Sequence, residues 1–541
     1  MEESVKESEG KRRGRYAVRA VVFAALLCVT LALLSALLTP MFGVEAKYSV
    51  QDAYDLPNNT VEVVAFGPST LRRGVSPAYL YETDGLAVYN SCSDSQPPIA
   101  ARYLLNDLLK TQKGTLKIVL LDAATLVKNT EFFDTSVGAE RVLACMKPSL
   151  NKLQYMINMA EDYEDFAFEE HLVPVLRYHS RWAELDEEDF TGMQSGDAMK
   201  LLCGQPLYPA MFLSNISRGS GGAYSLDEKV ITADVREASE EELEALWNAK
   251  CVHHIDQIVQ TCKENGINVL LVTTPRNSWT DTLHDSVSLY ADKHGLNYLD
   301  MSDSAVWQAT GLSFDTDFYD SKHPNLLGSR KISKYLGDYL KQHYELSDVR
   351  GNSAYSYLEE CSQEFERAYE DAQLVGCTNI EQYAEMLNRD RYTVFAAVYG
   401  EAADGLSAEA REKLSEAGFS GLAKLATNEL YAGAAEGGQL VKQRRSDEED
   451  QVGLYGSFDG KELILRQRNL QSGAILDDAL KVVSKNASAV KATISLRDED
   501  LCEGTRGISF VVYNHETGIM LDSSCFDTHE GSQRTSDVLV N

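Results

Sequence analysis

The sequence has no Cys-x-x-Cys pair, no repeat of fixed period and no low-complexity tract. Its ten cysteines are scattered, so we expect no zinc site, and we predict neither a bound metal nor a cofactor. Basic residues are scarce: 51 lysines and arginines stand against 82 aspartates and glutamates, and the formal net charge is −31. Such a charge repels nucleic acid and anionic membrane surfaces, which excludes a polyanion-binding role for the bulk of the chain.

The remaining composition is that of a folded globular protein, with 44% hydrophobic and 25% charged residues. At 541 residues the chain is too long for one ordinary core, and we expect two or more domains. Cys502 and Cys525 flank a predicted hairpin and are the first pair to test for a disulfide, with buried free thiols as the alternative.

Charge is missing from residues 20–39, close to the N-terminus. A run of about 20 apolar residues is long enough to cross a bilayer as a helix. The basic residues before it, between Lys11 and Arg19, place that end in the cytoplasm and the rest of the chain outside. The alternative is a cleaved signal peptide, because Val44-Glu45-Ala46 resembles a cleavage site. An uncleaved anchor is favoured because the apolar run is longer than the ~7–15 residues of the apolar region in a typical signal peptide.

Short apolar runs alternate with helix-like stretches in the next part of the chain. The predicted strands are Val61–Phe66, Lys117–Asp122, Asn268–Thr273 and Asn297–Asp300. The predicted helices that precede the last three are Ile99–Lys110, Val252–Asn265 and Asp281–His294. Continuous apolar strands separated by helices indicate an α/β fold with a parallel sheet covered on both faces. In such a sheet the active site lies at the carboxyl ends of the strands.

The C-terminal part of the chain changes character after an acidic, helix-like connector. Tyr392–Val398 is typical of a strand and Leu406–Ala417 of a helix. Further short strands are predicted at Lys461–Leu465, Val490–Leu496, Gly507–Tyr513 and Met520–Asp522, and Gln443–Gln451 is predicted to be a charged surface loop. We therefore expect a separate α+β domain. The predicted organisation is a cytoplasmic tail over 1–19, a transmembrane anchor over 20–42, a linker over 43–60, the α/β domain over 61–345, the connector over 346–389 and the second domain over 390–541.

Two distant segments of the α/β domain carry the candidate chemistry. Ser69 follows the first predicted strand, and Asp320 and His323 lie three residues apart near the end of the domain. A serine hydroxyl becomes nucleophilic when a histidine within hydrogen-bond reach takes its proton. The histidine in turn needs a carboxylate that holds its tautomer. We predict Ser69 as nucleophile, His323 as base and Asp320 as the orienting group; each alone is more often a turn or surface residue.

These segments resemble blocks of the SGNH/GDSL hydrolases. Phe66-Gly67-Pro68-Ser69 is similar to their first block, and Asp320-x-x-His323 to their last. The likeness is strongest to a membrane-anchored bacterial subgroup related to alginate acetylation proteins and to the D-alanyl transfer protein of teichoic acids. Further family-like segments are Tyr89–Pro97, Arg177–Trp182 and Asp317–Asp320. The resemblance spans roughly residues 60–345 and implies a flavodoxin-like three-layer domain.

The resemblance also implies an oxyanion hole, which stabilises the negative oxygen of the reaction intermediate. Its predicted donors are the Ser69 amide, the Cys92 amide and the Asn90 side chain. Cys92 stands where the family has a glycine, and no Gly-x-Asn-Asp block occurs, so Asn90 is a substitute for the usual third donor. These departures leave a degenerate, inactive hydrolase fold as the alternative.

Three residues are predicted to contact the substrate. Arg177 and His179 belong to a family-like segment, and Arg276 follows a predicted strand end, where it can line the cleft. For His179 the alternative is that it and Trp182 pack a loop over the sheet.

The C-terminal domain resembles the interleukin-like (ILEI) domain of secreted proteins. Arg506–Tyr513 and Cys525–Thr528 form a predicted hairpin with its turn at Asn514–Gly518. Tyr392–Glu401 is similar to the opening strand and acidic turn of that domain, with Gly400 where an aspartate is common. The resemblance implies a lectin-like module, and the residues alone indicate a binding or packing role.

We therefore expect a membrane-anchored extracytoplasmic serine esterase or acyltransferase. Its expected substrates are O-acyl groups, acetyl first, on a cell-envelope glycan, and an acyl-donor membrane protein is an expected partner if the reaction is transfer. A polyphosphate such as teichoic acid is disfavoured by the net charge of −31. The alternative is a degenerate hydrolase fold that serves as a surface carbohydrate-binding or scaffold protein.

Overall fold

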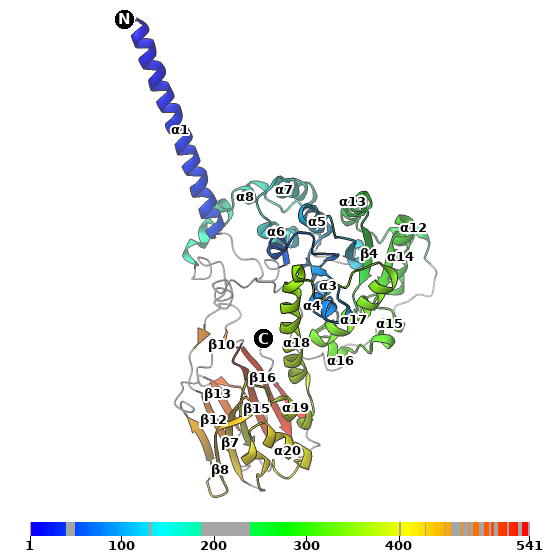
Figure 1. Ribbon diagram of the computed structural model, residues 1–541, viewed down its shortest axis with the longest axis vertical. Helices are drawn as coiled ribbons and strands as arrows, with labels where there is room; N and C mark the ends of the chain where they lie inside the picture. Colours follow the sequence, from blue (N-terminus) through cyan, green and yellow to red (C-terminus); the bar gives the residue numbers. More distant parts are fainter. Residues whose placement is uncertain are drawn as a thin grey trace. The chain divides into compact units, whose positions relative to one another are not determined.

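The computed structural model describes two compact units, one that ends at Glu366 and one that begins at Arg367 (Figure 1). The boundary falls inside the long helix α18 (Ser356–Gly376). The described residues are 2–38, 49–128, 133–185, 238–399, 402–427, 429–449, 451–455, 467–468, 475–476, 480–485, 492–496, 499–501, 507–516, 519–528 and 533–538.

The first unit is built on a parallel sheet. Among the described residues it has five strands in the order β2-β1-β3-β4-β5, and each neighbouring pair is parallel. This is the strand order of flavodoxin-like doubly wound sheets, and it confirms the predicted parallel α/β fold. The strands are β1 (Val63–Phe66), β2 (Val88–Asn90), β3 (Ile118–Asp122), β4 (Asn268–Thr273) and β5 (Asn297–Asp300).

Helices cover both faces of this sheet, which is why β1 and β3 are buried along their whole length. On one face α5 (Pro98–Gln112) packs against α13 (Ala249–Asn265). On the other face α17 (Leu326–His343) packs against α3 (Ser69–Gly74) and α4 (Pro77–Asp84), and Figure 1 shows the two layers on either side of the strands. The sheet is thus the middle of three layers.

Helix ends follow local capping chemistry. Helix α14 (Asp281–His294) begins where the Thr280 side chain accepts a hydrogen bond from the Leu283 N–H, and it ends at Gly295, whose φ of 65° few other residues adopt at low cost. The other helices of this unit are η1 (Asp52–Tyr54), η2 (Ala123–Leu126), α6 (Val137–Cys145), α7 (Leu150–Asp162), α8 (Phe168–Leu172), α9 (Val175–Tyr178), η4 (His179–Ala183), α12 (Glu240–Glu244), α15 (Ser304–Thr310), α16 (Phe314–Asp317) and η7 (Ser353–Tyr355).

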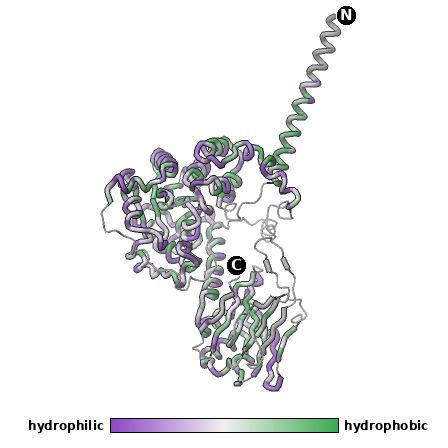
Figure 2. The backbone as a smooth tube through the Cα atoms, turned by 180° about the vertical axis from the view of Figure 1, so that it is seen from behind, coloured by the Kyte–Doolittle hydropathy of each residue, from purple (hydrophilic) through white to green (hydrophobic). Residues whose placement is uncertain are grey.

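Helix α1 (Glu2–Leu38) is the one helix, among the described residues, that is long and apolar enough to cross a membrane. Its apolar window, Arg15–Ser35, is 21 residues long and 0% buried. Figure 2 shows this apolar part of the helix in green. An exposed apolar helix at this place is consistent with a signal sequence or with a single membrane anchor. The candidate cleavage site Val44-Glu45-Ala46 lies outside the described residues.

The second unit is built on a mainly antiparallel sheet. Its described strands run in the order β14-β13-β12-β6-β15-β16-β17, with β7 paired to β6, β8 to β7 and β9 to β12. The strands are β6 (Tyr392–Tyr399), β7 (Leu430–Glu436), β8 (Gln439–Ser446), β9 (Gln451–Tyr455), β12 (Leu480–Lys485), β13 (Thr493–Leu496), β14 (Glu499–Asp500), β15 (Gly507–Asn514), β16 (Ile519–Asp527) and β17 (Gln533–Val538). A separate pair joins β10 (Gln467–Arg468) to β11 (Ile475–Leu476).

Residues of β6 alternate between two cores, as the period of a strand requires. Val394 packs with residues of α19 (Ile380–Met386), α20 (Ala408–Glu416) and α21 (Ser420–Ala423), whereas Phe395 belongs to the core on the opposite face. Helices therefore cover one face of this sheet.

The structure confirms one prediction for this unit and corrects another. The predicted hairpin is present, because Asn514 of β15 pairs with Ile519 of β16. The predicted loop at Gln443–Gln451 begins too early: β8 continues to Ser446 and pairs with β7, so residues 443–446 belong to a strand. Its charged side chains are typical of an edge strand, where charge discourages further pairing. Lys461–Leu465, Gly400 and Cys502 lie outside the described residues, and the resemblance to the ILEI domain stays a prediction.

Candidate active site

Ser69 is the first residue of α3, immediately after the carboxyl end of β1. This place lies between β1 and β3, where flavodoxin-like sheets bind their ligands. The loop before it is held on both sides: the Gly67 N–H donates to Gln96 Oε1 at 2.8 Å, and the Gly67 carbonyl accepts from the Ser93 N–H at 3.1 Å. A Cβ atom on Gly67 would lie 2.7 Å from Asp122 Cβ, so this close approach requires glycine.

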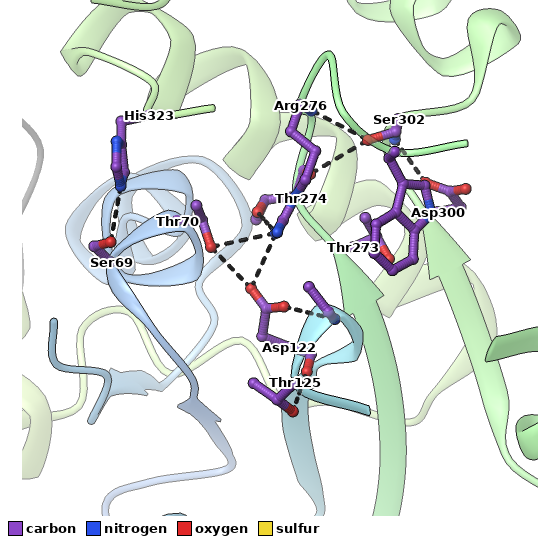
Figure 3. A network of polar contacts seen from close by, with 12 residues as sticks. Ser69, Thr70, Asp122, Thr125, Thr273, Thr274, Arg276, Asp300, Ser302 and His323 are labelled. Atoms are coloured by element: carbon purple, nitrogen blue, oxygen red, sulfur yellow. Dashed lines mark hydrogen bonds and ion pairs between the residues drawn. The ribbon is translucent and has the colours of Figure 1, made fainter. Parts of the chain in front are cut away.

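The structure brings Ser69, His323 and Asp320 together. The distance from Ser69 Oγ to His323 Nε2 is 2.8 Å, although the two residues are 254 positions apart, and Figure 3 shows the two side chains pointing at each other. His323 Nδ1 lies 2.6 Å from Asp320 Oδ2. A hydroxyl, an imidazole and a carboxylate joined in this order have the geometry of a serine hydrolase triad.

The surroundings of Asp320 determine the tautomer of His323. Burial opposes ionisation of this carboxyl, but hydrogen bonds from the imidazole and from the Lys322 and His323 amides outweigh it and lower the pKa of Asp320 to about 2. An ionised carboxylate can only accept hydrogen bonds. His323 Nδ1 must therefore carry the proton, and in the neutral imidazole Nε2 is left to accept the Ser69 hydroxyl.

Tyr319 packs against the imidazole, and Arg73 packs against Tyr319. The Tyr319 ring stacks on His323 with ring centroids 5.6 Å apart and an angle of 7° between the planes. The Arg73 guanidinium lies over the Tyr319 ring at 5.0 Å from its centroid. Burial raises the pKa of Tyr319 to about 12, so this ring stays neutral. Sequence reasoning missed Arg73, although a residue four positions after Ser69 lies on the same helical face.

Two of the predicted oxyanion donors are occupied by other groups. The Cys92 N–H donates to Asn90 Oδ1 at 3.2 Å. Asn90 Nδ2 donates to the carbonyl oxygens of Arg72 at 2.9 Å and Val75 at 2.8 Å. Asn90 therefore ties the end of β2 to the end of α3 and does not point its amide at an incoming substrate. The Ser69 amide, in the first turn of α3, belongs to the N–H groups that a helix leaves without an internal partner.

Arg276 lies beside the serine turn, as part of the polar network in Figure 3. The residue is 7% exposed, and its Nη2 donates to Thr274 Oγ1 at 3.0 Å and to Thr70 Oγ1 at 3.3 Å. The same nitrogen is 3.4 Å from Asp122 Oδ2, and Thr70 Oγ1 donates to that oxygen at 3.0 Å. Arg276, which is predicted to contact the substrate, is therefore hydrogen-bonded to Thr70, the residue that follows the candidate nucleophile.

The loop that contains Arg276 also reaches the turn of the candidate base. The Asn277 N–H donates to the Ser321 carbonyl oxygen at 3.1 Å, between Asp320 and His323. One loop thus contacts both halves of the candidate site.

Sequence reasoning also missed Asp122 and Gln96. Asp122 is the last residue of a strand that the sequence predicts. Because ligands bind at the carboxyl ends of parallel strands, a carboxylate at this position could have been predicted to belong to the site. Gln96 closes the family-like segment Tyr89–Pro97, and its amide nitrogen donates to the Ser91 carbonyl at 2.7 Å.

Arg177 and His179 are not joined to this site by any contact of the described residues. Arg177 pairs with Glu140 at 3.0 Å, and His179 Nδ1 lies 2.9 Å from the Leu176 carbonyl oxygen. Trp182 is 74% exposed, so the alternative in which it packs a loop over the sheet is wrong. Among the described residues, no cluster of three or more histidine, cysteine, aspartate or glutamate side chains could hold a metal ion.

Comparison with solved structures finds distant similarities, two of which are described below. No family model matches the chain, and no curated protein is significantly similar to it. One structure is a proposed lipolytic protein of the G-D-S-L family from Desulfitobacterium hafniense, with 13% identity, a TM-score of 0.23, and coverage of 51% of this chain and 98% of that chain.

The other is a proposed acylhydrolase from Bacteroides fragilis, with 13% identity, a TM-score of 0.24, and coverage of 54% of this chain and 94% of that chain. The chain is thus distantly similar to GDSL-type proteins over about half of its length. A likeness with such a TM-score carries no functional conclusion, and the function has to be argued from the site itself.

Proposed function

We propose that the protein is a membrane-anchored extracytoplasmic serine esterase or O-acyltransferase with Ser69 as nucleophile, His323 as general base and acid, and Asp320 as the orienting carboxylate. One observation carries the proposal: Ser69 Oγ and Asp320 Oδ2 lie 2.8 and 2.6 Å from the two nitrogens of one imidazole. Ser69 is 254 positions away from His323 in the chain, so local chain geometry does not account for its meeting with the Asp320–His323 turn.

The chemistry follows from this order of contacts. Ser69 Oγ attacks the ester carbonyl carbon while His323 Nε2 takes the hydroxyl proton. The intermediate collapses, the bond to the alcohol oxygen breaks, and the imidazolium returns the proton to the leaving alcohol. A water or a sugar hydroxyl then attacks the acyl-serine ester and regenerates Ser69, which makes the overall reaction hydrolysis or transfer.

Covalent labelling of the full chain in detergent with a fluorophosphonate tests the proposal. We expect the wild-type chain to be labelled, Ser69→Ala to lose labelling completely, and His323→Ala to slow it by about 10³-fold or more, because the base is gone. Ser321→Ala is a matched control in the turn of the base, and it should be labelled at the wild-type rate. Equal labelling of the wild type and Ser69→Ala would contradict the proposal.

In the proposed location, α1 remains attached to the protein and anchors it in the membrane. Ser35 and Leu38 of α1 accept hydrogen bonds from residues of α9 and η4, contacts that a cleaved leader could not keep. The proposed substrates are O-acetyl groups of a cell-envelope glycan. If the reaction is transfer, an acyl-donor membrane protein supplies the acetyl group. This part of the proposal rests on the resemblance to alginate acetylation proteins. The acetyl content of envelope glycan with and without Ser69→Ala tests it; unchanged content would exclude acetyl groups as the substrate.

A second candidate function is a carbohydrate-binding or scaffold protein that keeps the fold without activity. It is favoured by the occupied Cys92 and Asn90 donors, because an acyl-transfer site needs N–H groups aimed at the developing oxyanion. Failure of both fluorophosphonate labelling and acetyl release from p-nitrophenyl acetate would support it.

A further inference from the structure

A short helical segment beside the end of α1 exposes three large apolar side chains. They are Leu172 of α8, Leu176 of α9 and Trp182 of η4, with exposed fractions of 55%, 57% and 74%. Single exposed apolar residues are normal on a protein surface. These three lie on consecutive elements, and we term the segment Phe168–Ala183 that carries them the α8–η4 surface.

Hydrogen bonds fix this surface to the end of α1. The Val175 N–H donates to Ser35 Oγ at 3.2 Å, and Arg181 Nη1 donates to the Leu38 carbonyl oxygen at 2.8 Å. Ser35 is the last residue of the apolar window Arg15–Ser35. At a rise of about 1.5 Å per residue, such a window is about 30 Å long, which matches the hydrocarbon core of a bilayer. The α8–η4 surface is therefore bonded to α1 at the level where that helix leaves the hydrocarbon.

We propose that the α8–η4 surface docks into the outer headgroup layer of the bilayer that α1 spans. The proposal rests on the proposed anchoring by α1 and is independent of the chemistry of Ser69. Tryptophan side chains favour membrane interfaces because the indole has an apolar body and a polar N–H. Amphipathic helices that lie in the interface bury their apolar side chains about 5–10 Å into the boundary between headgroups and acyl chains.

The charges of the segment favour docking by apolar contact over attraction to anionic lipid. Arg177 is paired with Glu140 at 3.0 Å and with Glu170 at 3.7 Å, and Arg181 donates to the Leu38 carbonyl. The net charge of −31 opposes attraction of the chain to a negative surface. Docking is thus expected on zwitterionic lipid and is expected to survive high salt.

Depth-dependent fluorescence quenching of the full chain in phosphatidylcholine vesicles tests this proposal. Nitroxide groups are placed on the lipid either near the headgroup or deep in the acyl chains. The chain has four tryptophans, and Trp279 and Trp307 are only 1% and 5% exposed. We expect the shallow nitroxide to quench about twofold more of the emission than the deep one. Trp182→Phe should abolish this quenched fraction.

Two variants and a salt series make the test specific. Trp247→Phe is the matched control, which removes a tryptophan elsewhere in the first unit and should keep the quenched fraction. Leu172→Ser with Leu176→Ser should reduce quenching and leave fluorophosphonate labelling at Ser69 unchanged. Equal quenching of the wild type and Trp182→Phe would overturn the proposal. Quenching that requires phosphatidylglycerol and disappears in about 0.5 M NaCl would overturn apolar docking, as would a mature chain that lacks α1.

Discussion

Asp320 differs from an ordinary surface carboxylate because an imidazole N–H and two backbone amides converge on it. Its side chain is 34% exposed, so solvent still screens part of these interactions. The lowered pKa of about 2 means that the folded state favours the ionised form. The same contacts that orient His323 therefore also contribute to stability.

Asp320→Asn is expected to separate these two effects. An amide does not enforce the Nδ1–H tautomer, so kcat should fall by about 10⁴-fold while the fold remains. Because the folded pKa lies below the unfolded value, the stabilisation by Asp320 is fully present above about pH 4 and is lost as the pH falls toward about 2.

The measurement is urea unfolding of the wild type and Asp320→Asn at several pH values. We expect a difference of about 1 kcal/mol in the free energy of unfolding at pH 7, reduced for solvent screening, and this difference should shrink as the pH falls through about 2. A difference that stays constant between pH 7 and pH 2 would show that ionisation of Asp320 does not stabilise the fold.

Some residues of the site are visible in the sequence and others are not. Ser69 was predictable because it follows a strand, and Asp320 and His323 because an acid and a histidine occur in one turn. The pair formed by Asp122 and Arg276 has no local signal, since Asp122 ends β3 and Arg276 lies in the loop after β4, and the two meet only when β3 and β4 are paired. Tertiary pairing of this kind cannot be derived from spacing along the chain.

At the scale of elements, the best predicted segments have both a continuous apolar pattern and clear ends. Strands β4 and β5 and helix α14 have the predicted bounds. Strand β2 is too short to show a pattern, and it is fixed by pairing with β1. Strand β7 is rich in alanine and glycine, which have low strand propensity, so its place depends on pairing with β6 and β8.

Asn90 is the residue that connects two of these elements, and its replacement tests the connection. Asn90→Ala removes an acceptor from the Cys92 N–H and a donor from the carbonyls of Arg72 and Val75, all at buried positions. Buried polar groups left without partners cost about 1–3 kcal/mol each, so we expect the loss of three hydrogen bonds to cost about 3 kcal/mol or more.

Urea unfolding and ester hydrolysis by the same variant give the two readouts for Asn90→Ala. Because α3 carries Ser69 at its start, kcat should fall as well. Asn297→Ala is the matched control, since that side chain donates to Tyr344 on the exposed surface, and it should change the free energy of unfolding by less than about 0.5 kcal/mol. A stable Asn90→Ala variant would show that β2 and α3 hold each other by apolar packing alone.

At the scale of the whole molecule, the two units have separate hydrophobic cores. The core of the first unit gathers residues of β1, β3 and α17, including Val63 and Leu336. The second unit has its own two cores on either face of β6. Units with independent cores are expected to unfold in separate cooperative steps.

Each unit also contains a buried ion pair that can serve as a probe of its stability. In the first unit Arg276 lies 3.4 Å from Asp122, and in the second Arg391 lies 2.8 Å from Asp371. Removing one partner leaves a buried charge without compensation and costs about 3–5 kcal/mol.

Calorimetry of the full chain should therefore show two transitions. Arg276→Ala is expected to lower the Tm of one transition by about 10 °C and to leave the other unchanged, while Arg391→Ala should do the reverse. On heating, fluorophosphonate labelling of Ser69 should disappear at the transition whose Tm is lowered by Arg276→Ala. Below the Tm of that transition, Arg391→Ala should not change the labelling. If either variant moved both transitions equally, the two units would be one cooperative body, and the second unit would have to be treated as part of the machinery that holds the site.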